Sequence, residues 1–229
     1  DAVTVTISRV SDTGEVADVV DAAQSDLTAV GAILLSSTAG DITINDGDTD
    51  GLGLSSGGVT RVIAESGSVL INSGVKATNA ISISAADDVT QAAAGDITST
   101  SGTIDVLAVS GAISMNDGAV TATTDKDIRL VAGTDVTLGS LTAGTGSVSV
   151  IAGESILDGG DTDVDVIADG LRLVSGGNIG SATESLDTTI NVLSATAGGL
   201  ISVDETAAVV IDAVTVTISR VSDTGEVAD

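Results

Sequence analysis

Apolar and polar residues alternate along most of the chain, in short segments that follow a glycine or another turn residue. Segments of this kind begin at Gly67, Gly102 and Gly146, and each continues with β-branched or aliphatic residues at every second position. A period of two residues is typical of a strand with one buried face. The pattern therefore predicts an all-β protein made of many short strands.

The apolar segments recur about every 22 residues, in two interleaved series. The first series comprises Ile81, Ile104, Ile128, Val148, Leu171, Ile190 and Val214. The second comprises Ile113, Val136, Ile156, Ile179 and Ile201. Two series that advance together predict the coils of a solenoid, each with at least two strands. Before Ile81 the spacing is irregular and assigns no coils.

A two-sheet sandwich also has many short strands and glycine-rich turns. Regular spacing favours a parallel β-helix instead, because Ala, Val, Ile and Leu stack well at the ~4.8 Å distance between strands of successive coils. We therefore expect a β-solenoid with about 22 residues per coil.

Residues 15–30 depart from the strand pattern. Their apolar positions fall at spacings of three and four residues, which is the periodicity of a helix. Val is only a modest helix former, so a longer coil is the competing interpretation.

The two ends of the sequence are identical. Asp1–Asp18 and Asp212–Asp229 both read DAVTVTISRVSDTGEVAD, at an offset of 211 residues. This repeat predicts a tandem array in which residues 1–211 form one unit of nine to ten coils, about 45 Å long at ~4.8 Å per coil. Residues 212–229 would then begin the next unit, and the parent chain would continue Val-Val-Asp-Ala-Ala-Gln. A terminal strand duplicated for exchange between subunits is the alternative.

The composition narrows the chemistry that the chain can perform. The 229 residues are 42% hydrophobic, lack Phe, Trp, Tyr, His, Cys and Pro, and carry a net charge of −26. Without His or Cys we expect no zinc site, no disulfide and no Ser-His-Asp or Cys-His nucleophile. The charge disfavours nucleic acid and anionic membrane surfaces, and no apolar stretch approaches the ~20 residues that insertion into a bilayer requires.

Residues 126–160 (KDIRLVAGTDVTLGSLTAGTGSVSVIAGESILDGG) suggest a family. This segment resembles the repeat region of filamentous-haemagglutinin-type adhesins and related giant bacterial surface proteins. The resemblance implies a right-handed parallel β-helix that a Gram-negative cell secretes and displays on its outer surface. It is clearest over residues 81–203 and rests on composition and period.

The densest polar segment is a candidate calcium loop. Asp46, Asp48, Asp50 and Gly51 match the opening D-x-D-x-D-G, in which alternating carboxylates converge on one cation. Position 12 of an EF-hand would fall on Gly57, so the bidentate Glu is missing and no EF-hand is predicted.

A second acidic segment, residues 158–165, repeats the pattern and adds Asp161 and Asp163 as candidate ligands for weakly bound Ca²⁺. The competing interpretation is that Asp, Gly and Thr are simply good turn residues. No cofactor is required under either interpretation.

An enzyme is not expected. Some hydrolases on parallel β-helices use paired carboxylates, which this chain has in abundance. Their active sites also use cationic or aromatic side chains, and the seven cations here are scattered in the sequence. They are Arg9, Arg61, Lys76, Lys126, Arg129, Arg172 and Arg220.

The sequence therefore predicts a structural segment of a long, acidic, extracellular fibre or adhesin stalk. Its partners would be neighbouring identical repeats, joined covalently or stacked head to tail, together with lateral fibre contacts. The alternative function is a Ca²⁺- or glycan-binding adhesive module on the same solenoid scaffold.

Overall fold

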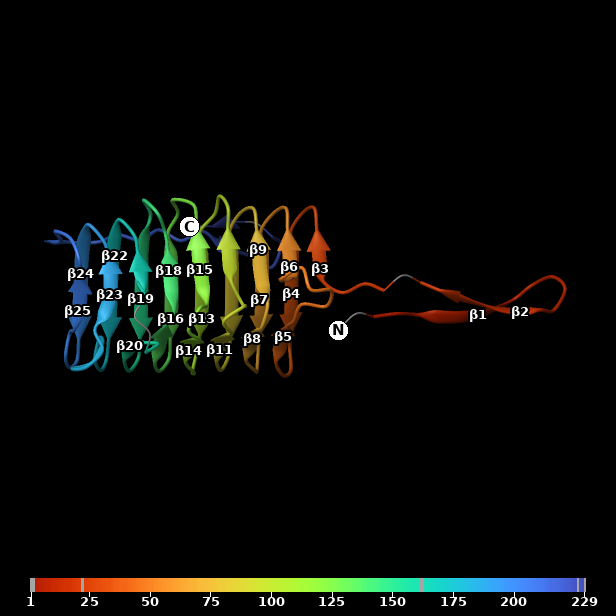
Figure 1. Cartoon of the computed structure of the whole chain (residues 1–229), viewed down its shortest axis with the longest axis horizontal. Coiled ribbons are helices and arrows are strands. Elements are labelled where there is room, and N and C mark those ends of the chain that lie inside the picture. The colour runs from red at the N-terminus through yellow and green to blue at the C-terminus, as the bar shows by residue number, and fades with distance from the viewer. Residues whose placement is uncertain (1–2, 22, 161–162, 226, 229) are drawn as a thin grey trace.

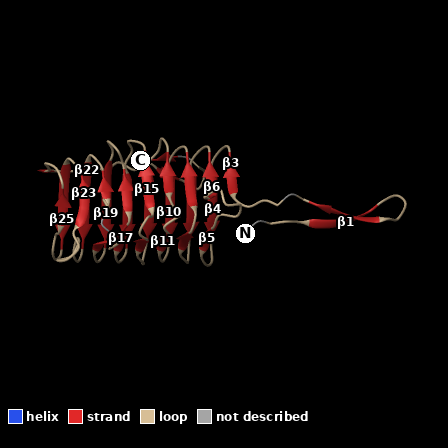
Figure 2. Ribbon diagram, in the orientation of Figure 1, coloured by secondary structure: helices blue, strands red, loops and turns tan. Residues whose placement is uncertain are grey.

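Three parallel sheets run along the long axis of the molecule, and each coil of the chain adds one strand to each sheet (Figure 1). The computed structural model describes residues 3–21, 23–160, 163–225 and 227–228. These residues form strands, turns and loops, and they contain no helix (Figure 2). None of the described segments is therefore a helix that is long and apolar enough to span a membrane. The prediction of an all-β parallel solenoid is confirmed.

Each sheet is built from every third strand of the coils. Sheet 1 comprises β4 (Ile33–Ser37), β7 (Thr60–Ala64), β10 (Ile81–Ala85), β13 (Ile104–Ala108), β16 (Ile128–Ala132), β19 (Ser147–Ala152), β22 (Gly170–Ser175), β24 (Val192–Ala197) and β26 (Val210–Ile211). Sheet 2 comprises β5 (Ile42–Ile44), β8 (Val69–Ile71), β11 (Val89–Gln91), β14 (Ile113–Met115), β17 (Val136–Leu138) and β20 (Ile156–Asp158). Sheet 3 comprises β3 (Leu27–Ala29), β6 (Leu52–Ser56), β9 (Gly74–Ala77), β12 (Ile97–Ser99), β15 (Val120–Thr123), β18 (Ser140–Thr142), β21 (Val166–Ile167), β23 (Leu186–Thr189) and β25 (Val203–Glu205).

The pairing register explains the period of the sequence. Every member of the second apolar series pairs with the next, the last ones as single bridges that extend sheet 2 to Ile179 and Ile201. The first series is confirmed from Ile81 to Leu171. Its last two members are wrong, for reasons that lie in the ends of the strands.

Leu193, and not Ile190, is the partner of Leu171. Ile190 follows the end of β23 and is buried at the corner before β24. Val214 lies outside the three sheets, in the segment that repeats the start of the chain.

The core is a stack of aliphatic side chains. Ile104, Ile128 and Val148 occupy equivalent inward positions on successive coils, and each is 0% exposed. Inward and outward residues alternate along β10 and β16, which show the same burial pattern. Similar branched side chains pack directly above one another at the strand spacing, so the composition without aromatic residues suffices for a continuous core.

A long corner explains why the sequence before Ile81 shows no regular period. Ile33 pairs with Thr60, a step of 27 residues, whereas Thr60 pairs with Ile81, a step of 21. The extra length lies between β5 and β6, where residues 45–51 form an irregular loop. The strands on both sides keep their register, so the insertion changes only the corner.

Residues 15–30 form neither a helix nor a regular coil. β1 (Thr6–Val10) and β2 (Val16–Val20) pair as an antiparallel hairpin that projects beyond the end of the solenoid (Figure 1). The helix interpretation is wrong because Val, the commonest apolar residue here, is β-branched and favours extended backbone. A turn with Gly14 at φ +81° closes the hairpin.

The C-terminal copy of the repeated sequence forms the same turn. β27 (Arg220–Val221) and β28 (Val227–Ala228) pair with Arg220 opposite Ala228, which is the register of Arg9 and Ala17 in the first copy. This copy does not project. It runs back along the outside of sheet 1, behind the coils in the view of Figure 1.

The packing predicts how a core substitution acts. Ile128→Ala removes most of a buried side chain at the centre of sheet 1, so we expect the free energy of unfolding to fall by about 2–5 kcal/mol. Ile211→Ala is the matched control, because Ile211 is 74% exposed. Its effect should stay within about 0.5 kcal/mol. Urea denaturation followed by circular dichroism measures both, and equal losses would contradict the assignment of the inward face.

Candidate functional site

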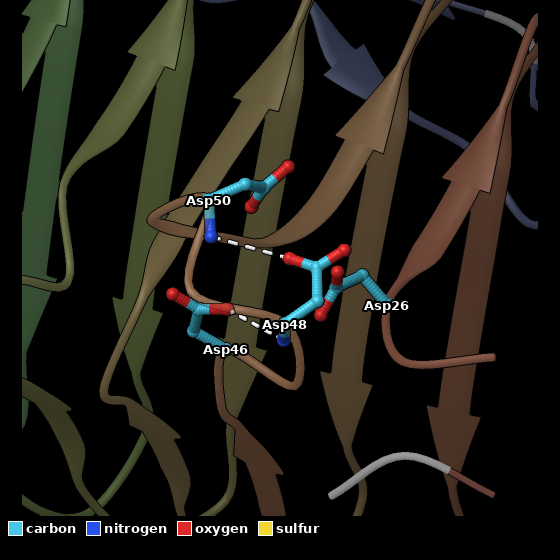
Figure 3. Close-up of side chains that lie close together, drawn as sticks. All are labelled: Asp26, Asp46, Asp48 and Asp50. Atoms are coloured by element: carbon cyan, nitrogen blue, oxygen red, sulfur yellow. Dashed lines mark hydrogen bonds between the residues drawn. The ribbon is translucent and has the colours of Figure 1, made fainter. Parts of the chain in front are cut away.

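The acidic loop of residues 45–51 lies at the corner between sheets 2 and 3. It brings Asp46, Asp48 and Asp50 together, as the sequence predicts, and it adds Asp26 from the preceding coil (Figure 3). One carboxylate oxygen of each of these four residues lies within 4.8 Å of the others. Asp26 and Asp46 are half-buried, whereas Asp48 and Asp50 are exposed.

Asp46 organises the loop through backbone hydrogen bonds. Its Oδ1 accepts from the N–H groups of Asp48 (3.0 Å) and Thr49 (2.6 Å), and its Oδ2 accepts from Gly51 N–H (2.8 Å). The bond from Gly51 is the main reason why the pKa of Asp46 lies below its ordinary value of 3.8, because hydrogen bonds to a carboxylate favour its ionised form. Thr49 and Gly51 adopt positive φ, at +75° and +86°.

The other three carboxylates also accept backbone hydrogen bonds. Asp48 Oδ1 accepts from Asp50 N–H at 3.2 Å, and Asp50 Oδ1 accepts from Leu52 N–H at 2.8 Å. Asp26 Oδ1 accepts from Gly47 N–H at 3.0 Å and thereby holds the loop to the preceding coil.

This geometry has two chemical uses. Each carboxylate oxygen has a further lone pair, so four converging carboxylates supply the hard oxygen ligands that Ca²⁺ prefers. The same bonds also account for the loop as a self-contained turn. The calcium site therefore stays a prediction.

Sequence reasoning missed Asp26. The residue stands directly before β3, whose Leu27 pairs with Leu54 of β6, so it occupies the same corner one coil earlier. The signal that could have found it is this register, which the 27-residue coil conceals in the sequence.

The second acidic segment does not join the first. β21, which follows it, lies five strands along sheet 3 from β6, or roughly 24 Å at ~4.8 Å per strand. Asp161 lies outside the described residues. Asp163 is exposed and borders an open groove of about 390 Å³, which Gly118 and Gly139 also line.

Many of the remaining aspartates accept hydrogen bonds between coils. In each case a carboxylate on one coil accepts a backbone N–H of the next coil, at 2.7–3.0 Å. The acceptors are Asp41, Asp88, Asp96, Asp125, Asp127, Asp135 and Asp165. Hydrogen bonds from the Thr145 backbone and side chain, helped by the charge of Lys126, lower the pKa of Asp125. Much of the negative charge therefore contributes to stacking.

The structure gathers cations that are scattered in the sequence. Arg61, Arg129 and Arg172 occupy one outward column of sheet 1, because the register aligns the second residue of each strand. Asp105 lies in the same column and pairs with Arg129 at 3.1 Å and with Arg220 of the C-terminal copy at 2.8 Å. The expectation that no cationic cluster forms is therefore wrong for this face.

The hydrogen bonds of Asp46 predict an acid-sensitive loop. Because folding lowers its pKa, the ionised carboxylate stabilises the fold fully above about pH 3.8, and this contribution disappears as the pH falls through the folded pKa. We expect Asp46→Asn to lower the Tm at about pH 7, and we expect the difference from the wild type to vanish in strong acid. Asp117→Asn, at an exposed position, is the control. A difference that does not depend on pH would contradict the assigned role.

Divalent cations test the calcium site directly. Because backbone bonds already engage all four carboxylates, we expect CaCl₂ and MgCl₂ at equal ionic strength to raise the Tm equally, through screening of the −26 charge. A specific site would give a calcium-dependent rise that saturates with concentration. Such a rise, abolished by Asp48→Asn with Asp50→Asn, would overturn this expectation and establish the site.

Comparisons with known proteins leave the function to the geometry. No family model matches the chain, and no curated protein or solved structure is significantly similar to it.

Proposed function

We propose that this chain is a segment of a long, acidic, extracellular fibre or stalk built from tandem 211-residue β-solenoid units. The observation that carries the proposal is the repeat itself. Eighteen identical residues recur at an offset of 211, and both copies form the same turn in the same register. One sequence that precedes the solenoid and also follows it is what a tandem array requires.

The ends of the sheets are compatible with stacking of units. β3 and β25 are the edge strands of sheet 3, and β4 and β26 are those of sheet 1. Edge strands present unpaired backbone groups, and another unit placed on them would continue the ladders. Nine strands advance sheet 1 by about 38 Å at ~4.8 Å per step, so copies of the unit set the length of the fibre.

The surface chemistry supports exposure to a harsh medium. Seven Lys and Arg residues and no aromatic residues leave few sites for trypsin-like or chymotrypsin-like proteases. The resemblance of residues 126–160 to filamentous-haemagglutinin-type repeats favours the surface of a bacterial cell. The function is then mechanical, since continuous ladders and aliphatic stacks make a stiff rod.

The second candidate is a binding module that holds Ca²⁺ or a glycan through acidic corners. The convergence of Asp26 with Asp46, Asp48 and Asp50 is the observation that favours it. It adds to the stalk function and does not compete with it, because the corners lie outside the stacked core.

The mass of the parent chain tests the tandem array. We expect a fully denatured chain of several hundred kilodaltons, with peptides that read GEVADVVDAAQ across the boundary between units. A denatured chain of about 22.1 kDa would contradict the array. A large chain whose peptides lack that junction would contradict it as well.

A further inference from the structure

The two copies of the repeated sequence lie in different environments. In the N-terminal copy Val3, Val5, Ile7 and Val10 are 66%, 48%, 53% and 71% exposed. The equivalent residues of the C-terminal copy are covered by the solenoid. They are Val214, Val216 and Ile218, which are half-buried, and Val221, which is 5% exposed. One sequence thus occurs once as an uncovered hairpin and once as a docked segment.

Backbone bonds hold the docked segment to successive coils. Every second N–H group of the segment donates to a polar side chain of sheet 1 or of the corner before it. The bonds run from Thr217 to Asp127 Oδ2 (2.7 Å), from Ser219 to Thr103 Oγ1 (3.0 Å) and from Val221 to Ser82 Oγ (3.0 Å). Thr103 Oγ1 also donates to Ser219 O at 3.2 Å. The polar side chains along this face therefore match the spacing of an extended strand.

Side chains add specificity to this contact. Arg220 Nε lies 2.8 Å from Asp105 Oδ2, and Asp105 is only 5% exposed beneath the segment. Val221 packs with Val59 and Ala80 in a small cluster separate from the main core.

A glycine admits the other end of the segment. A Cβ on Gly170 would lie 2.9 Å from Val214 Cγ1, so a larger residue there would push the segment away. We call this face, from Gly170 to Val59 along the outside of sheet 1, the side groove.

We propose that the N-terminal hairpin, residues 3–24, docks in the side groove of a second copy of this unit, as residues 212–228 dock in the side groove of this one. The proposal rests on the tandem arrangement proposed above. Each hairpin would then lie along the unit that precedes it and hold the joint between two solenoids from the side.

The directions of the two copies agree with this joint. The N-terminal hairpin projects along the long axis, away from the solenoid that follows it (Figure 1). The docked copy runs from Val214 beside β22 back to Gly225, whose Cβ position lies 3.7 Å from Leu34 of β4. Both copies therefore point toward lower-numbered coils. A hairpin returns the chain to its base, where the next solenoid begins.

The groove has room for a complete hairpin. Beside the docked strand lies an open groove of about 210 Å³, which Arg220, Val221 and the outward residues Ile63 and Leu107 line. The second strand of the N-terminal hairpin, Val16–Val20, carries three exposed valines that could cover such apolar residues. Exposed apolar surface of this kind marks an interaction site.

Charge also favours this occupant. The outward column of sheet 1 holds Arg61, Arg129 and Arg172, three of the seven cations of a chain that is otherwise strongly acidic. The hairpin carries four carboxylates against a single arginine. These carboxylates belong to Asp12, Glu15, Asp18 and Asp21.

A donor and an acceptor variant of the full chain test the proposal. The wild type serves as donor, because its hairpin is uncovered and its own C-terminal copy fills its groove. The acceptor carries three substitutions that release the docked copy, Ile218→Asp, Arg220→Glu and Val221→Asp. It also carries the equivalent changes Ile7→Asp, Arg9→Glu and Val10→Asp, so that it offers a groove and no hairpin. Faster hydrogen exchange of the Ser219 and Val221 amides verifies that its groove is open.

Donor and acceptor should form a 1:1 complex in sedimentation velocity at up to about 1 mM and about 0.15 M salt. A donor with Ile7→Asp, Arg9→Glu and Val10→Asp should bind about tenfold more weakly or not at all. Thr4→Asp in the donor, at an outward position of the same segment, is the matched control and should preserve the complex.

Absence of a complex with an acceptor whose groove is open would overturn the proposal. Equal binding by the donor with the changed hairpin would overturn it too, because the contact would then not involve the hairpin. The mass of the parent chain is measured independently, so a failed joint between units is distinguishable from a failed tandem array.

Discussion

The register between successive coils is the constraint on which the whole molecule depends. Ile104, Ile128 and Val148 lie directly above one another only while each strand pairs with its equivalent on the next coil. A slip of one residue would turn every inward side chain outward. Variation in length is therefore confined to the corners, where residues 45–51 extend one coil and leave the flanking strands in place.

The same register organises the polar residues. Corner carboxylates such as Asp127 accept backbone N–H groups of the next coil, so the acidic composition stabilises stacking and also keeps the surface soluble. On the outside of sheet 1 the alignment of Arg61, Asp105 and Arg129 creates a polar column that no stretch of sequence contains. The side groove lies along this column, and its bonds to the docked segment follow the coil spacing.

A fibre of such units needs strength at its joints as well as in its coils. Within a unit, three parallel sheets and a continuous aliphatic core resist bending. Between units, contact at the sheet edges alone would be short and easily separated. A hairpin that lies along the preceding unit would widen the joint, and it would also cover apolar residues such as Val10 that are otherwise exposed. In this arrangement one repeated sequence serves both as the link in the chain and as the splint across it.

The sequence by itself determined the strands, their period near 22 residues and the inward positions, because a two-residue alternation and aliphatic stacking are local properties that each coil repeats. It also placed Asp46, Asp48 and Asp50 in one loop, since neighbours in sequence are neighbours in space. Ser11–Gly14 was a readable turn signal for the hairpin. Only the tertiary structure decided that Asp26 joins this loop, and that two identical segments lie in different environments. Those outcomes depend on which coils and which outer face lie alongside a segment, and identical residues carry no information about that.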